Sequence, residues 1–113
     1  MVQAAALRTH QEDYVRIHFM LNKGERPPQL LADVEVHFEE GPLAGLKMVG
    51  CSVWRSKKGE APAVLVPSRS YATAQGVRYF ELLRDSEEGK HKQTSEFKKY
   101  IREEYKKIAD VPA

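Results

Sequence analysis

The residues best suited to chemistry in this sequence are cations interleaved with aromatic rings in the middle of the chain. They form two clusters, one before and one after a short apolar run, and comprise Trp54, Arg55, Lys57, Lys58, Arg69 and Tyr71. Cations neutralise phosphates and aromatic rings stack on unpaired bases, so this composition is typical of nucleic-acid-binding surfaces. A tryptophan in a strand is also commonly a core or dimer-interface residue, and that alternative stays open for Trp54.

A second group of cations follows where the sequence has a helical period. Lys98, Arg102 and Lys106 recur every four residues, so they share one side of a predicted helix, with Lys99 beside them. Such a row can contact phosphates, and ordinary solvated charge is the alternative. Two glutamates, at positions 103 and 104, dilute the positive charge of this row.

Positive charge is concentrated in two segments of a chain whose formal net charge is only +2. Residues 47–84 carry seven basic and two acidic side chains, a net of +5. Residues 90–107 carry seven basic and three acidic side chains, a net of +4. This asymmetry favours an anionic partner, although lysine-rich solvated surface also explains it.

Nothing in the sequence has the spacing of a catalytic or metal centre. The four histidines lack zinc-ligand spacing, and Cys51 has no cysteine partner. No motif places a base or an oxyanion hole beside a serine, and the glycines do not form a phosphate-binding loop. His18 and His37 could approach each other across paired strands, where solvated strand residues are the default. We therefore expect a binding protein that is not an enzyme and that uses no cofactor or metal.

Length and composition limit the class of protein further. The 113 residues fit one domain, and Cys51, as the only cysteine, suits a reducing compartment. No apolar run reaches the roughly 20 residues that span a bilayer, and the first residues lack the pattern of a signal peptide. We expect a cytoplasmic protein with a flexible extension over residues 1–12, one domain over 13–109 and a tail over 110–113.

Alternation of apolar and polar residues predicts the strands. They cover residues 15–21, 32–38, 46–55, 63–66 and 77–83. The stretch 32–38 alternates most cleanly, whereas 77–83 alternates weakly and a helix there stays open. Gly50 marks either a bulge or a close backbone approach, and Pro67 ends the fourth strand.

One helix is predicted near the end of the chain. Its apolar stripe recurs at spacings of four, four and three, and consists of Phe97, Ile101, Tyr105 and Ile108. Ser95 is the expected N-cap, with Thr94 as the alternative. Strands followed by one helix predict an α+β fold, with a small antiparallel or mixed sheet of four to five strands and one C-terminal helix packed on it.

Three segments between Leu31 and Arg69 occur in a familiar order. The sequence Leu-Ala-Asp-Val-Glu-Val-His-Phe is followed by Gly-Leu-Lys-Met-Val-Gly-Cys-Ser-Val-Trp-Arg and then by Ala-Val-Leu-Val-Pro-Ser-Arg. With Arg-Tyr-Phe-Glu at 78–81 and the Glu-Tyr pair in the helix, this arrangement resembles the stage V sporulation protein G (SpoVG) family. Pro67 and Ser68 with Arg69 stand where that family has a Pro-Ser-Lys/Arg signature.

The resemblance implies a small α+β homodimer that binds DNA or RNA and acts as a bacterial regulator. Together with the charge pattern, it predicts binding mainly through phosphates. The predicted contacts are Arg55, Lys57, Lys58, Arg69, Lys98, Lys99, Arg102 and Lys106. The alternative is a non-catalytic protein-interaction module that uses a sheet edge or the dimer surface. Neither a membrane nor a small-molecule substrate is expected.

Overall fold

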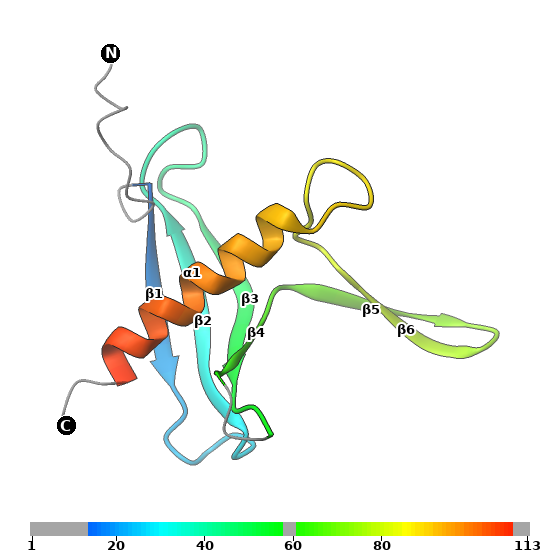
Figure 1. Cartoon of the computed structure of the whole chain (residues 1–113), viewed down its shortest axis with the longest axis horizontal. Coiled ribbons are helices and arrows are strands. Elements are labelled where there is room, and N and C mark those ends of the chain that lie inside the picture. Colours follow the sequence, from blue (N-terminus) through cyan, green and yellow to red (C-terminus); the bar gives the residue numbers. More distant parts are fainter. Residues whose placement is uncertain (1–13, 58–60, 110–113) are drawn as a thin grey trace.

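Six strands precede one helix in the computed structural model, which describes residues 14–57 and 61–109 (Figure 1). The elements are β1 (Val15–Leu21), β2 (Leu30–Phe38), β3 (Lys47–Trp54), β4 (Ala63–Leu65), β5 (Ser68–Thr73), β6 (Gly76–Glu81) and α1 (Lys92–Ala109). β1 to β4 form an antiparallel meander, and β5 and β6 form a separate two-stranded sheet. The predicted α+β class is confirmed. The predicted extension over 1–12 and the tail over 110–113 lie outside the described residues.

One face of the four-stranded sheet is turned toward α1, which crosses it diagonally (Figure 1). This follows from the alternation in β2, where Ala32, Val34 and Val36 are at most 1% exposed. The polar residues between them therefore lie on the opposite face. Val34 pairs with Phe19 of β1 and with Cys51 of β3, so the buried face continues over three strands.

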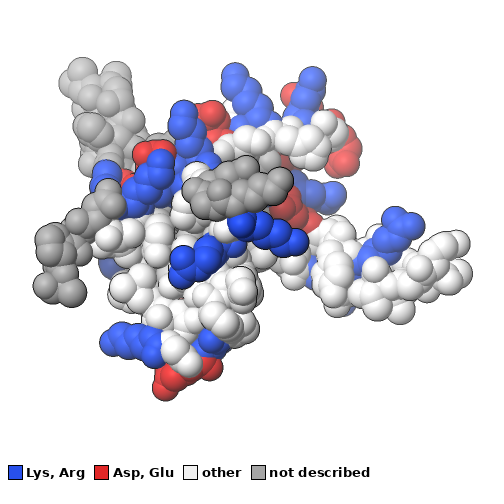
Figure 2. All heavy atoms as spheres, turned by 60° about the horizontal axis from the view of Figure 1, so that its bottom comes forward, with Lys and Arg blue, Asp and Glu red and all other residues white. Residues whose placement is uncertain are grey.

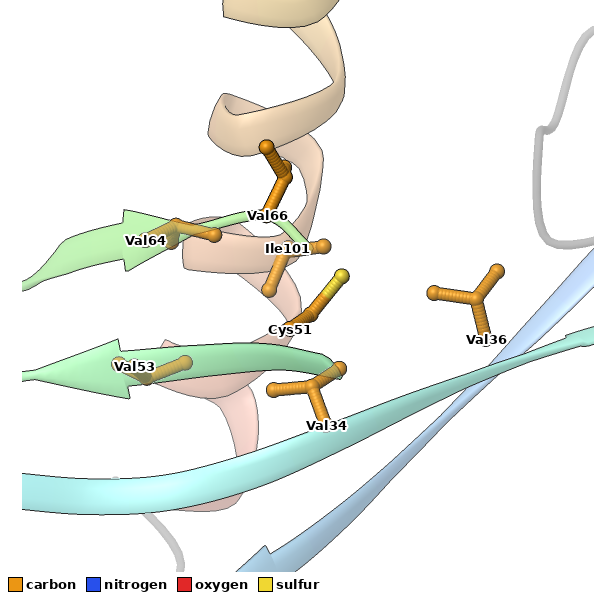
Figure 3. Packing of buried hydrophobic residues seen from close by; sticks show 7 residues of the cluster. All are labelled: Val34, Val36, Cys51, Val53, Val64, Val66 and Ile101. Atoms are coloured by element: carbon orange, nitrogen blue, oxygen red, sulfur yellow. The ribbon is translucent and has the colours of Figure 1, made fainter. Parts of the chain in front are cut away.

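The hydrophobic core lies between this sheet face and α1 (Figure 3). Its buried cluster consists of Val34, Val36, Cys51, Val53, Val64, Val66 and Ile101. Phe97 and Tyr105 pack against the cluster from the helix turns before and after Ile101, whereas Ile108 is exposed. The predicted stripe is thus confirmed over its first three members. Burial raises the pKa of the Cys51 thiol to about 11, which keeps it protonated and inert.

Gly50 in β3 is both a bulge residue and a point of close backbone approach. β3 places one extra residue between the partners of Val34 and Val36, which is a β-bulge. Gly50 has a φ of +106°, and a Cβ there would lie 3.2 Å from the Pro67 side chain. Only glycine adopts this conformation and tolerates this contact without strain. The chain that leaves β4 can therefore pass directly against β3.

The β5–β6 hairpin extends away from the sheet and α1 (Figure 1). The last predicted strand, 77–83, corresponds to β6, so the helical alternative for that stretch is wrong. β5 has no counterpart among the predicted strands. We call β1–β4 and α1 together the body of the protein. The β5 sequence Ser-Arg-Ser-Tyr-Ala-Thr lacks an apolar alternation, because the body covers neither face of this hairpin.

Asp85 in the preceding loop caps α1, which corrects the predicted N-cap. The helix begins at Lys92, so Ser95 and Thr94 lie inside it and not before it. The Asp85 carboxylate accepts hydrogen bonds from the backbone N–H groups of Gln93 and Thr94, both at 2.9 Å. These bonds, first that of Gln93, lower the pKa of Asp85. A carboxylate here also suits the positive end of the helix dipole.

The solvent side of α1 is charged along its length. Lys106 Nζ lies 3.5 Å from Glu103 Oε2, and Lys107 Nζ lies 2.7 Å from Glu104 Oε2, each pair spanning about one turn. Lysines in the last turn also suit the negative end of the helix dipole. Within residues 14–57 and 61–109, no helix is long and apolar enough to cross a membrane.

Candidate nucleic-acid interface

The predicted phosphate contacts lie in three places: after the end of β3, on the β5–β6 hairpin and on α1. Arg55, Lys57, Arg69 and Lys99 are exposed, and none of them forms an ion pair with a residue in the described ranges. Lys58 lies outside the described residues. The four exposed cations are therefore available to an anionic ligand.

The helix row is largely occupied by contacts within the molecule. Lys98 Nζ lies 3.0 Å from Glu81 Oε2 at the end of β6. Arg102 Nε donates to the backbone carbonyl of Pro62 at 2.8 Å, and Lys106 has the helical partner described above. Lys98 and Arg102 therefore hold the root of the hairpin and the start of β4 against α1.

Arg55 lies next to the C-terminal half of α1. Arg55 and Tyr105 line the same hollow of about 470 Å³, and Arg102 contacts the carbonyl just before β4. The cations of the β3–β4 connection and of α1 thus share one end of the body. We call this group the basic edge, and it consists of Arg55, Lys57 and Arg102. Figure 2 brings this end forward, and Lys and Arg side chains reach out over the middle of the view.

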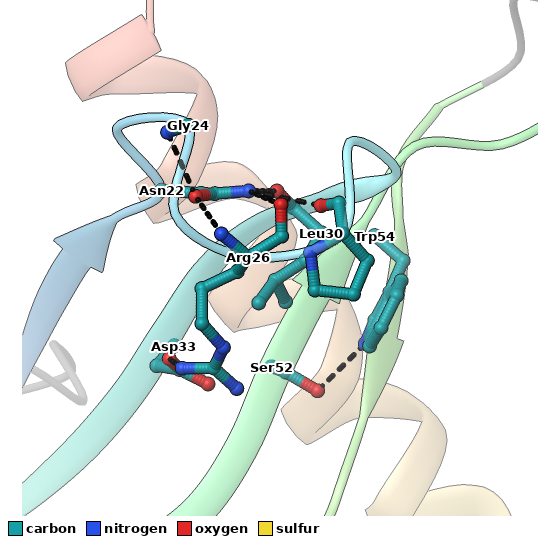
Figure 4. Close-up of polar contacts among 8 residues, drawn as sticks. Asn22, Gly24, Arg26, Leu30, Asp33, Ser52 and Trp54 are labelled. Carbon is teal, nitrogen blue, oxygen red and sulfur yellow. Dashed lines mark hydrogen bonds and ion pairs between the residues drawn. The ribbon is translucent and has the colours of Figure 1, made fainter.

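The loop after β1 contributes another wall of this hollow and is held by one asparagine (Figure 4). Asn22 Nδ2 donates to the carbonyl of Pro27 at 2.9 Å, and Asn22 Oδ1 accepts from the backbone N–H of Arg26 at 3.2 Å. The Arg26 guanidinium pairs with Asp33 at 2.8 Å. Arg26 is therefore committed to a carboxylate, which leaves Arg55 as the available cation on the hollow's described lining.

Trp54 lies on the sheet face away from α1 and is not part of the core. Its neighbour Val53 is buried on the helix side, so the strand alternation turns Trp54 outward. The indole Nε1–H donates to Ser52 Oγ at 2.8 Å on the same face (Figure 4). The core alternative for Trp54 is therefore wrong, and the half-buried ring flanks the basic edge from the other side of the sheet.

The β5–β6 hairpin gathers cations and rings on one of its faces. Arg69 pairs with Phe80 and Tyr71 pairs with Arg78, and directly opposed residues in an antiparallel pair share a face. The rings of Tyr71 and Phe80 meet edge to face, with centroids 5.5 Å apart. The sequence indicated Arg69 and Tyr71 but not Arg78 and Phe80. Arg78 and Phe80 are two positions apart in the sequence, which already suggests a shared face. Only the strand register places them beside Arg69 and Tyr71.

A polar cluster on the outer sheet face has no metal-binding geometry. The rings of His18 and His37 approach edge to face, with centroids 6.2 Å apart. Glu35 accepts from Lys47 Nζ at 2.9 Å and lies 3.0 Å from His37 Nε2; the bond from Lys47 and then that from His37 lower its pKa. Among the described parts of the chain, no group of three or more His, Cys, Asp or Glu side chains could hold a metal ion.

No family model matches the chain, no curated protein matches it, and no solved structure matches it. The resemblance to the SpoVG family therefore stays a prediction, carried by the segments between Leu31 and Arg69, by residues 78–81 and by the Glu-Tyr pair in the helix. The surfaces described above have to support any functional inference.

Proposed function

We propose that this chain is a small nucleic-acid-binding regulatory protein that contacts DNA or RNA mainly through phosphates. The observation that carries the proposal is that four of the predicted contacts, Arg55, Lys57, Arg69 and Lys99, are exposed and form no ion pair within the described ranges. An unpaired cation can neutralise a phosphate and release the counterions that the phosphate holds. A cation already paired must first give up its carboxylate, so the unpaired ones contribute most.

The basic edge supports this proposal through the arrangement of its arginines. Arg102 is fixed by the bond from its Nε to the Pro62 carbonyl, which leaves the other guanidinium donors for a ligand. Arg55 and Lys57 follow β3 at the same end of the body. A guanidinium can clamp a phosphate with two donors, whereas a lysine acts as a point charge. The edge therefore suits a backbone of phosphates better than a single small anion.

The proposed protein binds without catalysing a reaction, uses no cofactor and works in the cytoplasm. Its thiol supports the compartment, because Cys51 is the only cysteine and lies buried as a free thiol. A reducing environment suits such a residue. The regulatory role and a bacterial source come from the resemblance alone.

A homodimer is part of the proposal, and one exposed surface supports it. On the hairpin face opposite the arginines, Val77 is 63% exposed and Tyr79 is 73% exposed. Exposed apolar side chains of this size commonly mark contact sites between proteins. The same face favours the second candidate function, a non-catalytic protein-interaction module. A partner bound there in a salt-insensitive way would support that second function.

Salt-dependent binding tests the proposal. Labelled single-stranded DNA, duplex DNA and RNA are titrated with the full chain across a salt series and followed by fluorescence anisotropy. We expect the logarithm of affinity to fall linearly with the logarithm of salt concentration. Replacing Arg55→Gln together with Lys57→Gln should reduce the slope on single strands by about 1.4, because each lost contact removes about 0.7.

A matched control removes two positive charges at the other end of the same sheet. Arg16 and Lys47 both pair with His37 in the strand register, far along β2 from the end that leads to Arg55. Arg16→Gln with Lys47→Gln should leave the slope unchanged. Absence of binding to all three nucleic acids at low salt would refute the proposal and favour the protein-interaction module.

A further inference from the structure

The β5–β6 hairpin, which we call the arm, is exposed over nearly its whole length. Among its strand residues only Thr73 and Glu81 are partly buried. An isolated two-stranded hairpin is at best marginally stable in water, and its side chains add nothing to the core beneath α1. The aromatic rings of the arm therefore lie outside the core, and their exposed parts are available to another molecule.

Hydrogen bonds hold the arm at its root and at its tip. At the root, the Leu82 N–H donates to the Pro67 carbonyl at 2.7 Å, and Lys98 Nζ lies 3.0 Å from the Glu81 carboxylate. At the tip, the Thr73 hydroxyl donates to the carbonyl that closes the turn, at 2.7 Å. The arm is thus a defined ribbon presented from a fixed base.

The two faces of this ribbon differ in chemistry. One face, which we call the Arg–aromatic face, carries Arg69, Tyr71, Arg78 and Phe80. The other face carries Ser68, Ser70, Ala72, Val77 and Tyr79, with Glu81 at the root. On the first face each arginine lies directly across from a ring, and the two rings are 47% and 38% exposed. Cations and rings therefore alternate on one face of the ribbon.

Charge complementarity selects the ligand for the Arg–aromatic face. Residues 68–80 contain two arginines and no acidic residue, and Figure 2 shows the outer part of the arm in white and blue. Glu81, the acidic residue at the root, pairs with Lys98. Arginines beside exposed rings match phosphates beside unpaired bases, because every base offers a face for stacking. In a duplex those faces are already stacked on neighbouring bases, so the rings favour a single strand.

We propose that the Arg–aromatic face of the arm binds single-stranded nucleic acid. Arg69 and Arg78 contact phosphates, and Tyr71 and Phe80 stack on unpaired bases. The inference rests on the proposed function and adds to it a second surface, separate from the basic edge. The basic edge contacts phosphates of either kind of strand, whereas the arm distinguishes a single strand from a duplex.

Removing the rings while keeping the arginines tests this inference. The full chain and its variants are titrated against labelled oligothymidine and a labelled duplex at the same low salt. Tyr71→Ala with Phe80→Ala should weaken binding to oligothymidine by at least about thirtyfold and leave duplex binding unchanged. Tyr71→Leu with Phe80→Leu, which keeps apolar bulk on the hairpin, should give a similar loss. The control for loss of exposed apolar bulk lies outside the arm, in the loop between β2 and β3: Leu43→Ala with Leu46→Ala, both exposed, should leave both affinities unchanged.

The outcomes separate this inference from the proposed function. If the ring variants bind oligothymidine as the wild type does while the Arg55→Gln, Lys57→Gln variant binds weakly, the arm inference fails and the proposed function stands. Equal losses from the ring variants and from the Leu43→Ala, Leu46→Ala control would also overturn the arm inference. If light scattering shows a dimer for the wild type and a monomer for the ring variants, and the affinities are unchanged, the Arg–aromatic face contacts a second copy of the chain. That result would also overturn the arm inference. If the wild type binds neither oligothymidine nor the duplex, both the proposed function and the arm inference are overturned.

Discussion

The body, formed by β1–β4 and α1, and the arm have opposite relations to water. In the body, β2 buries every second side chain against α1, and Ile101 closes the core from the helix side. In the arm, the rings of Tyr71 and Phe80 on one face and of Tyr79 on the other are exposed to solvent. Folding accounts for the apolar residues of the body, because burial there stabilises the fold. The apolar residues of the arm stay exposed after folding, and contact with a ligand or a partner explains that exposure better.

Truncating a core residue should expose this difference most clearly. Ile101→Ala removes a fully buried side chain and should lower the free energy of unfolding by about 3 kcal/mol, measured by urea denaturation. The arm comparison is Tyr79→Ala, which should change that free energy by less than about 0.5 kcal/mol. If the two variants lost similar free energies of unfolding, the arm would stabilise the body, and the contrast between the two regions would be wrong.

The junction between body and arm should show a smaller effect. Gly50→Ala adds a Cβ at 3.2 Å from Pro67 in a left-handed conformation and should cost about 2 kcal/mol in the same assay. Gly45→Ala is the matched control, since it has a φ of +89° and no atom within 4 Å of the added Cβ. It should cost about 1 kcal/mol, from conformation alone. Equal costs would mean that the contact between β3 and Pro67 contributes nothing.

The cap of α1 should give the smallest effect, and one that depends on pH. Hydrogen bonds from α1 lower the folded-state pKa of Asp85, so its charge stabilises the fold above the unfolded-state pKa of about 3.9. That contribution is lost as the pH falls through the folded-state pKa. Asp85→Asn should therefore be less stable than the wild type near neutral pH and approach it in acid, as measured by thermal unfolding. A difference that does not vary with pH would contradict a role for the charge.

The fold of the body could be predicted from the sequence because burial of one side of a strand or helix produces regularly spaced apolar residues. The alternation of Ala32, Val34 and Val36 predicted both the strand and its inner face, and the spacing around Ile101 predicted the helix. β5 was missed because neither of its faces is buried, so its sequence has no apolar period. The N-cap was wrong because Asp85 reaches α1 from a loop, and such a contact leaves no mark at the helix start.

The candidate site could be predicted only in part, because its geometry depends on contacts between distant residues. Arg69 and Tyr71 were recognisable as neighbours in the sequence, but their partners Arg78 and Phe80 required the register of the hairpin. Lys98 was expected to contact phosphates. Its pairing with Glu81, 17 positions earlier in the chain, could not be read from helical spacing.

The buried thiol of Cys51 allows the opening of the core to be followed by chemical labelling of the protein. It is the only cysteine in the sequence, and at 1% exposure it lies among side chains from β2, β3, β4 and α1. A thiol-reactive dye can reach it only when these elements separate, so the labelling rate follows the opening of the body. The same label is insensitive to rearrangements of the arm. One chemical readout can therefore establish whether a ligand held by the arm also stabilises the core.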